Sequence, residues 1–249
     1  TVFRSGRKNL STYVMSDLHG NYKAYKDMLE KIEFSNADTL FILGDILDRG
    51  PHPIKIILDV MNRPNVEVLA GNHCMMALEC MSFLMREVTL ESLAELNIEK
   101  IEKLVNWQQN GAETTINEFR KCNTATRQTV FEFISGLDVY DEVEIGEKTF
   151  ILVHAGLGNF SPDKQMWEYE LNELVWDRPD YEKMYFPDKY IISGHTPTMA
   201  IKYNPRPGYI YQANHNIAID CGCNFPGGRL ACLRLEDMKE FYVETEGSI

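Results

Sequence analysis

Five short segments of this chain carry Asp, His or Asn side chains, which are residue types that bind divalent metals through oxygen or imidazole nitrogen. The segments are Asp17-Leu18-His19-Gly20, Gly44-Asp45-Ile46-Leu47-Asp48-Arg49-Gly50, Gly71-Asn72-His73, Val153-His154-Ala155-Gly156 and Ser193-Gly194-His195-Thr196-Pro197. They hold four of the six histidines of the chain. Carboxylates, imidazoles and an amide, with no thiolate among them, suit two adjacent hard-to-borderline ions. Such a pair of ions is typical of phosphoester hydrolysis.

Each segment follows an apolar run that predicts a β-strand. The runs are Tyr13–Met15, Thr39–Leu43, Val66–Ala70, Phe150–Val153 and Tyr190–Ser193. Short continuous apolar runs are typical of buried parallel strands. In open α/β sheets, ligands bind in the crevice at the carboxyl ends of the strands. We therefore expect the five segments to meet in one site.

The spacing also favours particular roles. Asp17 and His19 are two residues apart, so on an extended chain they point the same way and reach one ion. A buried charge such as Asp45 needs a partner or a metal, and its carboxylate can bridge two ions. Asn72 supplies a neutral oxygen, whereas the adjacent His73 points elsewhere and suits a general acid. Asp17-x-His19 alone is equally consistent with a structural role, and a lone histidine at a strand end is usually structural, but the set of five segments favours the metal site.

In order and spacing, these segments resemble the signatures of bacterial phosphoprotein phosphatases, members of the calcineurin-like metallophosphoesterase superfamily. The resemblance spans residues 15 to 197. It implies a metallophosphatase that uses a hydroxide bound to two metal ions. The expected metal is Mn, and Fe and Zn are the alternatives. The fold it implies is an α/β/β/α sandwich of two mixed sheets with a helical insertion.

The resemblance also implies roles for single residues. It places metal ligands at Asp17, His19, Asp45, Asn72, His154 and His195. Asp17 and His19 would hold one ion with Asp45, and Asp45 would bridge to a second ion held by the other three. His73 resembles the general acid, oriented by Asp48. Arg49 resembles a phosphate-binding arginine, and Arg178, in Trp176-Asp177-Arg178, resembles a second one.

Two departures from the family pattern bear on the substrate. Relatives that act on proteins often have Arg before Gly-Asn-His and Glu after it, where this chain has Ala70 and Cys74. The dinucleoside tetraphosphatase branch also lacks that Arg, but it tends to lack the Asp at the position of Asp48. The sequence therefore predicts a phosphoric monoester hydrolase that acts on phosphoserine, phosphothreonine or small phosphoesters. Symmetrical hydrolysis of dinucleoside tetraphosphates is the alternative, and an inactive binding homologue is a third.

The rest of the chain predicts one metallophosphoesterase domain over residues 1–249. Helices are expected at Tyr22–Ile32 and Pro53–Met61, which complete a β-α-β-α-β start. A Leu-, Met-, Glu- and Lys-rich stretch at about residues 75–135 predicts the helical insertion. A hairpin is expected at residues 139–153, and a strand-rich tail from Gly208 to Val243 predicts a second sheet.

Composition restricts the partners. The net charge of −12 argues against a nucleic-acid-binding module. No apolar run is long enough to span a bilayer, and the start at residues 1–9 is polar, so we expect a cytoplasmic enzyme without a membrane partner. The six cysteines have no Cys-x-x-Cys pair and are expected to stay reduced. The expected partner is a phosphorylated protein or a small phosphoester substrate.

Overall fold

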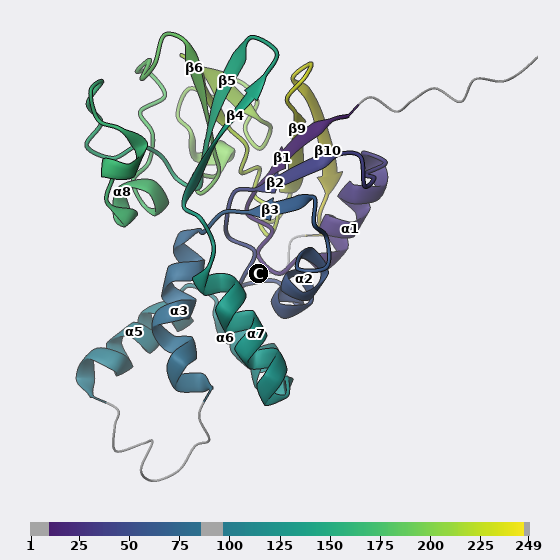
Figure 1. The fold of residues 1–249 in the computed structure, drawn as a ribbon, viewed down its shortest axis with the longest axis vertical. Helices are drawn as coiled ribbons and strands as arrows, with labels where there is room; N and C mark the ends of the chain where they lie inside the picture. Colours follow the sequence, from purple (N-terminus) through teal and green to yellow (C-terminus); the bar gives the residue numbers. More distant parts are fainter. Residues whose placement is uncertain (1–9, 86–96, 247–249) are drawn as a thin grey trace, which may run out of the picture.

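Two five-stranded β-sheets form the centre of the computed structural model, which describes residues 10–85 and 97–246 (Figure 1). The predictions made for residues 1–9, and for residues 86–96 of the helical insertion, fall outside these ranges. Among the described helices, none combines the length and the apolar character needed to cross a bilayer.

The first sheet has the strand order β10-β9-β1-β2-β3. Its strands are β1 (Thr12–Met15), β2 (Thr39–Ile42), β3 (Val66–Val68), β9 (Arg229–Arg234) and β10 (Lys239–Glu244). β1, β2 and β3 run parallel, and β9 is antiparallel to both β1 and β10. Three carboxyl ends therefore point to the same edge of this sheet.

Two helices make the crossovers between the parallel strands, as the sequence predicted. They are α1 (Tyr22–Lys31) and α2 (Pro53–Val60). The Asn21 side chain caps α1 by accepting the N–H of Ala24, and Pro53 opens α2, where its fixed φ suits the first helical turn.

The second sheet has the strand order β4-β5-β6-β8-β7. Its strands are β4 (Tyr140–Ile145), β5 (Lys148–Val153), β6 (Lys189–Ser193), β7 (Tyr211–Ala213) and β8 (Asn216–Ala218). β5, β6 and β8 run parallel, and antiparallel strands flank them on both sides. The predicted hairpin is thus β4 and β5, and both sheets are mixed.

The sheets pack face to face because strand residues alternate between two apolar clusters. Val14 and Phe41 of the first sheet share a cluster with Phe150, Leu152 and Ile192 of the second. Their strand neighbours face outward instead. Tyr13, Met15, Leu40 and Ile42 pack against α1 and α2, while Ile151 and Val153 pack beneath α8. The result is the predicted α/β/β/α sandwich.

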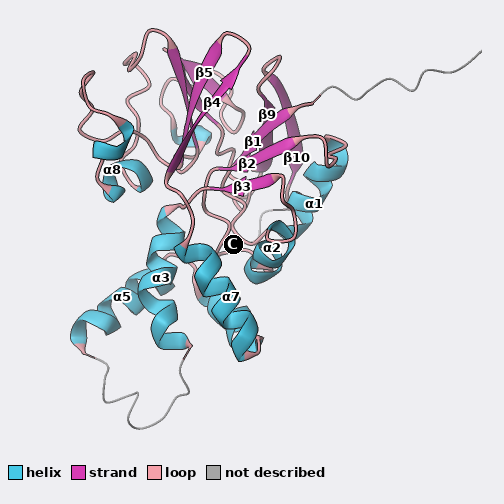
Figure 2. Cartoon of the chain, in the orientation of Figure 1, coloured by secondary structure: helices cyan, strands magenta, loops and turns pink. Residues whose placement is uncertain are grey.

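A group of helices lies between β3 and β4 in the chain and beyond one end of the sheets (Figure 2). They are α3 (Asn72–Leu84), α5 (Ile98–Gln109), α6 (Glu113–Lys121) and α7 (Thr124–Ser135). The helical insertion is therefore confirmed, although α3 begins at Asn72, three residues before the predicted start. That the whole chain forms one domain stays a prediction.

Short elements follow the strands of the second sheet. These are η1 (Met166–Glu168) and α8 (Leu171–Val175) between β5 and β6, and η2 (Thr198–Ala200) after β6. α8 begins with a capping box, in which the Glu173 side chain accepts the N–H of Glu170 at 2.8 Å.

The strand-rich tail does not form one sheet, contrary to the prediction. β7 and β8 join the second sheet, whereas β9 and β10 extend the first. β9 pairs antiparallel with β1, so Val14 lies opposite Leu233. Alternating strand patterns reveal strands but not their partners, because sheet membership depends on contacts distant in sequence.

Gly44, which follows β2, is expected to be essential for close packing of the strand ends. Its φ is +82°, and a Cβ there would lie 2.7 Å from the Cα of Gly71 and 2.7 Å from Nδ1 of His154. Gly146 also has a positive φ, +62°, but a Cβ there would meet no atom within 4 Å. Both Ala substitutions carry the left-handed backbone penalty, and only Gly44→Ala adds overpacking.

We expect Gly44→Ala to lower the free energy of unfolding by about 1–3 kcal/mol more than Gly146→Ala does. Urea unfolding of both variants in EDTA, followed by tryptophan fluorescence, measures the difference without a contribution from bound metal. Equal losses would show that the strand ends have room to separate.

Candidate metal centre

The structure brings all five predicted segments together at the strand ends. Asp17 and His19 follow β1, Asp45 follows β2, and Asn72 begins α3 just after β3. The later histidines follow β5 and β6 of the other sheet. Five of the six predicted ligands are buried, namely Asp17, His19, Asp45, Asn72 and His154, and His195 is half-buried. The carboxyl ends of parallel strands from two packed sheets therefore share one crevice.

The reason given for pairing Asp17 with His19 was wrong, although the pairing itself is present. Neither residue is extended, since their φ angles are +52° and +41°. Their side chains nevertheless approach, with Nε2 of His19 lying 3.8 Å from Oδ1 of Asp17. The loop is held by the carbonyl of Leu47, which accepts a hydrogen bond from Nδ1 of His19 at 3.0 Å. Nε2 is thus left facing the cluster.

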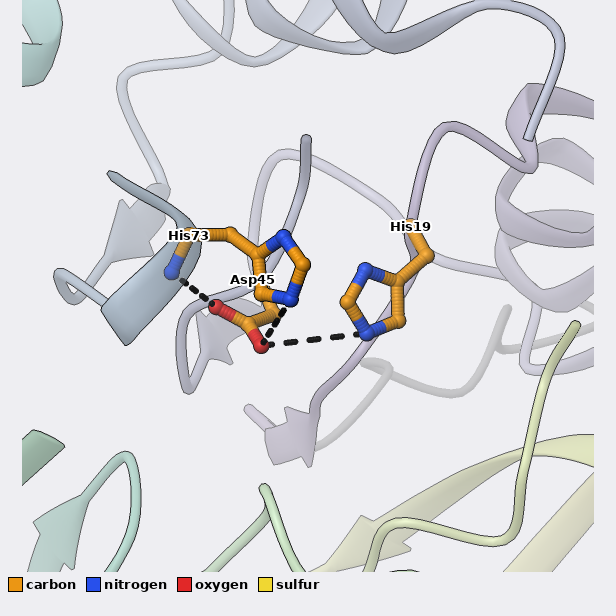
Figure 3. Close-up of side chains that lie close together, drawn as sticks. All are labelled: His19, Asp45 and His73. Carbon is orange, nitrogen blue, oxygen red and sulfur yellow. Dashed lines mark hydrogen bonds and ion pairs between the residues drawn. The ribbon is translucent and has the colours of Figure 1, made fainter. Parts of the chain in front are cut away.

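Asp45 lies at the centre of the cluster (Figure 3). Its Oδ1 accepts the N–H of His73 at 3.1 Å and so caps the first turn of α3. Its Oδ2 faces three imidazoles, with Nε2 atoms of His19, His73 and His154 at 3.7, 3.9 and 3.4 Å. These separations are longer than a good N–H···O hydrogen bond. The three imidazole nitrogens and Oδ2 therefore surround a common space instead of bonding directly to one another.

A second group of ligand atoms shares Asp45. Oδ1 of Asn72 lies 2.9 Å from Nε2 of His154 and 3.1 Å from Nδ1 of His195. Nδ1 of His154 donates to the carbonyl of Leu43 at 2.7 Å, which directs Nε2 to the cluster. Asp45, His154 and His195 offer ligand atoms that all lie within 4.8 Å of one another.

The charges of these buried groups perturb one another. Burial alone would raise the pKa of Asp45, but the surrounding imidazoles, His154 foremost, hold it well below its usual value. Burial disfavours the imidazolium of His154, yet the Asp45 carboxylate raises its pKa to about 9. Burial, and then the charge of His154, lowers the pKa of His195 to about 4.

The outer ligands are shifted mainly by loss of solvent. Burial raises the pKa of Asp17, and the nearby Asp45 adds to this effect. Burial and then the charge of His73 lower the pKa of His19 well below its usual value. Buried ionisable groups with shifts in opposite directions are typical of functional sites. A cation among them would favour the carboxylate of Asp17 and the neutral imidazole of His19, the forms that bind metals.

The donor set fits two metal ions. It contains carboxylate, amide and imidazole donors, arranged as two groups that both include Asp45. Such mixed oxygen and nitrogen ligation suits Mn, Fe and Zn. The structure thus supports a dinuclear site, while the identity of the metals and the division of ligands between the two ions stay predictions.

His73 lies in the same cluster but is tied to Asp48. Its Nδ1 donates to Oδ2 of Asp48 at 2.6 Å, as the role of Asp48 in orienting it requires. Its Nε2 lies 3.1 Å from a guanidinium nitrogen of Arg49, and Arg49 also reaches Nε2 of His19 at 2.8 Å. His73, His19 and Asp45 also form one of the groups able to hold a metal. The general-acid assignment therefore stays a prediction.

Two residues that hold Asp48 were missed by the sequence analysis. Nε1 of Trp107 donates to Oδ2 of Asp48 at 2.8 Å, and the hydroxyl of Thr115 donates to Oδ1 at 2.5 Å. The Thr115 hydroxyl also accepts the N–H of Asp48 at 2.9 Å. All three side chains are fully buried. No signal in the sequence pairs a Trp and a Thr with a carboxylate about 60 residues away, because the helical insertion brings them together.

The second predicted arginine lies at the rim. Arg178 is exposed, and its charge contributes to lowering the pKa of His195 after burial and His154. Trp176 packs edge-on against the His195 ring, with centroids 6.0 Å apart, and keeps 38% of its surface exposed. The segment after α8 therefore borders the cluster on the His195 side.

The cysteines supply no ligand group among the described residues. All six are free thiols. Cys74 is fully buried next to the cluster, and burial raises its pKa to about 12. A thiol with that pKa stays protonated at neutral pH, and Cys74 belongs to neither group of potential ligand atoms in the described residues.

The fold and the cluster together define a metallophosphoesterase. The family model for calcineurin-like phosphoesterases matches residues 10–199, and the chain belongs to that family. It is therefore a metal-dependent phosphoesterase.

Proteins named asymmetrical bis(5'-nucleosyl)-tetraphosphatase PrpE are among its relatives. The one from Bacillus mycoides (strain KBAB4) is 27% identical over 262 aligned residues, covering 93% of each chain. That from Bacillus cereus (strain Q1) is 28% identical, covering 91% of each.

Solved structures confirm the fold. One provisionally assigned as a diadenosine tetraphosphatase is 17% identical, with a TM-score of 0.64, covering 95% of this chain and 94% of the other. A protein serine/threonine phosphatase from Saccharomyces cerevisiae is 15% identical, with a TM-score of 0.53, covering 96% and 80%.

Asp45→Asn tests the centre of the cluster directly. The substitution keeps the shape of the side chain but removes the charge that both ligand groups share. We expect less than one ion per chain after dialysis, measured by elemental analysis, against two for the unaltered protein. Asp237→Asn changes an exposed carboxylate paired with Arg234 and serves as the control. Two retained ions in Asp45→Asn would contradict the assignment.

Proposed function

We propose that this chain hydrolyses dinucleoside polyphosphates asymmetrically, releasing a nucleoside monophosphate and a nucleoside triphosphate from diadenosine tetraphosphate. The observation that carries the hydrolytic part is the shared Asp45 carboxylate, with ligand groups on both sides and Arg49 beside it. The activity named for relatives that align over nine-tenths of the chain supports the choice of substrate.

The residues of this chain have separable tasks. The two ions, when bound, would supply Lewis-acid activation of water and charge neutralisation at phosphorus. The Arg49 guanidinium, already within 3.1 Å of His19 and His73, is placed to bind phosphoryl oxygens through its paired N–H groups. Asp48 fixes the ring of His73, whose Nε2 is directed at the cluster to protonate the leaving oxygen.

Ala70, which stands where relatives that act on proteins often have an arginine, supports a dinucleotide substrate over a phosphomonoester. Ala70 is fully buried, and its N–H donates to the carbonyl of Asp138 at 2.7 Å. No positive charge is available there to bind a dianionic monoester. An anhydride linkage depends less on such a charge, since its phosphate leaving group needs little help to depart.

Phosphomonoester hydrolysis is the second candidate and was our first expectation from the sequence. The intact Asp48–His73 pair, at 2.6 Å, favours it. Monoesters of serine, threonine or small alcohols leave as alkoxides and need an oriented acid. Both candidates use the same metal site, so the substrate must be decided by kinetics.

We expect kcat/KM for diadenosine tetraphosphate, with Mn²⁺ present, to exceed that for a phosphothreonine peptide by at least about tenfold, equivalent to about 1.4 kcal/mol in transition-state binding. Chromatography of the products should show AMP and ATP in equal amounts. Two molecules of ADP would instead indicate the symmetrical cleavage considered from the sequence. A tenfold preference for the peptide would establish the second candidate and refute the proposal.

His73→Asn separates acid catalysis from metal binding. We expect kcat with an alkyl phosphate to fall by about 10²–10⁴-fold, because the alkoxide must be protonated as it leaves. The loss should be smaller with p-nitrophenyl phosphate or the dinucleotide, whose leaving groups are weaker bases. Metal content should not change.

The matched control is His215→Asn, which alters a histidine of the β7–β8 turn that stacks on Tyr190. It should leave both activities intact. Loss of an ion from His73→Asn would instead make His73 a ligand, and equal losses on all substrates would rule out its role as the acid.

A further inference from the structure

A pocket of about 460 Å³ opens beside Arg49, on the side of the cluster formed by the helical insertion. One wall is formed by the end of α5, the turn after it and the start of α6, and the other by Asn224 and Phe225, which follow β8. The residues of the first wall are Gln109, Asn110, Gly111, Glu113 and Thr114. Its volume lies within the roughly 300–1,000 Å³ usual for small-molecule sites. The mechanism proposed above uses Arg49 but none of the other lining residues.

Both walls are attached to residues of the cluster. The N–H of Arg49 donates to the carbonyl of Gly111 at 2.8 Å, while its guanidinium reaches His19 and His73. On the other wall, Nδ2 of Asn224 donates to the carbonyl of His19 at 2.7 Å. The side chain of Arg49 therefore lies between the pocket and the cluster where the phosphate would react.

Contact between Arg49 and the turn is close. Gly111 has a φ of +97°, and a Cβ there would lie 2.8 Å from Cγ of Arg49. The absence of a side chain at Gly111 lets the turn pack directly on the arginine. The position of the pocket relative to the cluster is thus fixed by a main-chain hydrogen bond and by packing.

Most of the lining residues are polar by type, but most of the surface they present to the pocket is apolar, and few of them are charged. Phe225 is half-buried and presents an aromatic ring, and Gln109 and Asn110 present amide groups. The hydroxyl oxygen of Thr114 is buried and has no hydrogen-bond partner within the part of the chain that the structure describes. The lining has two charged side chains, Arg49 beside the metal cluster and Glu113.

These lining side chains suit a nucleoside better than inorganic phosphate or a phosphopeptide. A planar base can stack on Phe225 and use the amides of Gln109 and Asn110 for its polar edge. Glu113 would repel further phosphates but can accept from a ribose hydroxyl or an exocyclic amine. The single cation lies at the end of the pocket nearest the cluster, where a phosphate joined to that nucleoside would be.

We propose that this pocket binds one nucleoside of the substrate, with its base against Phe225, and so selects nucleotides over simple phosphoesters. The identity of the biological substrate in this proposal rests on the proposed function, but the test below does not. Binding here would hold the phosphate chain across Arg49 and present one of its phosphates to the metal cluster.

The test uses inhibition of p-nitrophenyl phosphate hydrolysis in excess Mn²⁺, with ATP and tripolyphosphate as probes. The two inhibitors have the same number of phosphates and differ by the adenosine. In the unaltered protein, ATP should inhibit at least about tenfold more tightly than tripolyphosphate, on the order of one base–aromatic stack. Phe225→Ala should remove that difference while leaving p-nitrophenyl phosphate turnover within about twofold.

Trp176→Ala is the matched control, because Trp176 is an aromatic side chain with an exposed surface that packs on His195 and does not line the pocket. It should preserve the preference for ATP. If Phe225→Ala loses basal turnover through misfolding, Phe225→Leu keeps the apolar bulk without the aromatic ring and should show the same loss of preference.

Two results would overturn the proposal. One is equal inhibition by ATP and tripolyphosphate in the unaltered protein. The other is loss of the preference in Trp176→Ala but not in the Phe225 variants, which would place the base on the His195 side. Failure of the unaltered protein to cleave diadenosine tetraphosphate would refute the proposed function alone, since the inhibition test does not require that cleavage.

Discussion

The structure of this phosphoesterase depends on how the buried carboxylate of Asp45 is compensated. A carboxylate that is 2% exposed at the end of a central strand is strongly unfavourable unless positive charge or hydrogen-bond donors surround it. Its Oδ1 is satisfied by the first turn of α3, and its Oδ2 faces three imidazoles. The same arrangement that compensates Asp45 provides the donors for two cations.

The fold supplies these donors because two mixed sheets pack with their parallel strands ending in one crevice. β1, β2 and β3 bring Asp17, His19, Asp45 and Asn72 from one sheet, and β5 and β6 bring His154 and His195 from the other. Close approach of the strand ends needs glycines, as at Gly44 and Gly71. The helical insertion then completes the site from outside the sheets by fixing Asp48 and by forming the wall of the pocket next to Arg49.

Sequence patterns predicted the parts of the site that are local in the chain. The apolar runs before Asp45, His154 and His195 marked true strand ends, because a buried strand and the polar residue after it are adjacent in sequence. The backbone at Asp17 and His19 was not predictable in the same way, since nothing in Asp-x-His distinguishes a left-handed loop from an extended one.

Features that depend on long-range contacts were also missed. Trp107 and Thr115 reach Asp48 through the packing of α5 and α6, and the strands of the tail divide between the two sheets. The pocket beside Arg49, which we propose selects the substrate, is likewise a long-range feature. Its walls come from residues more than 100 positions apart, so no local motif describes it.

The most direct test of the dinuclear site is a crystal structure of the protein loaded with Mn²⁺, measured with anomalous scattering at the manganese absorption edge. Two anomalous peaks about 3.5–4 Å apart are expected, with Asp45 as the carboxylate ligand common to both. A single peak, or two peaks of which neither is bound by Asp45, would contradict the account.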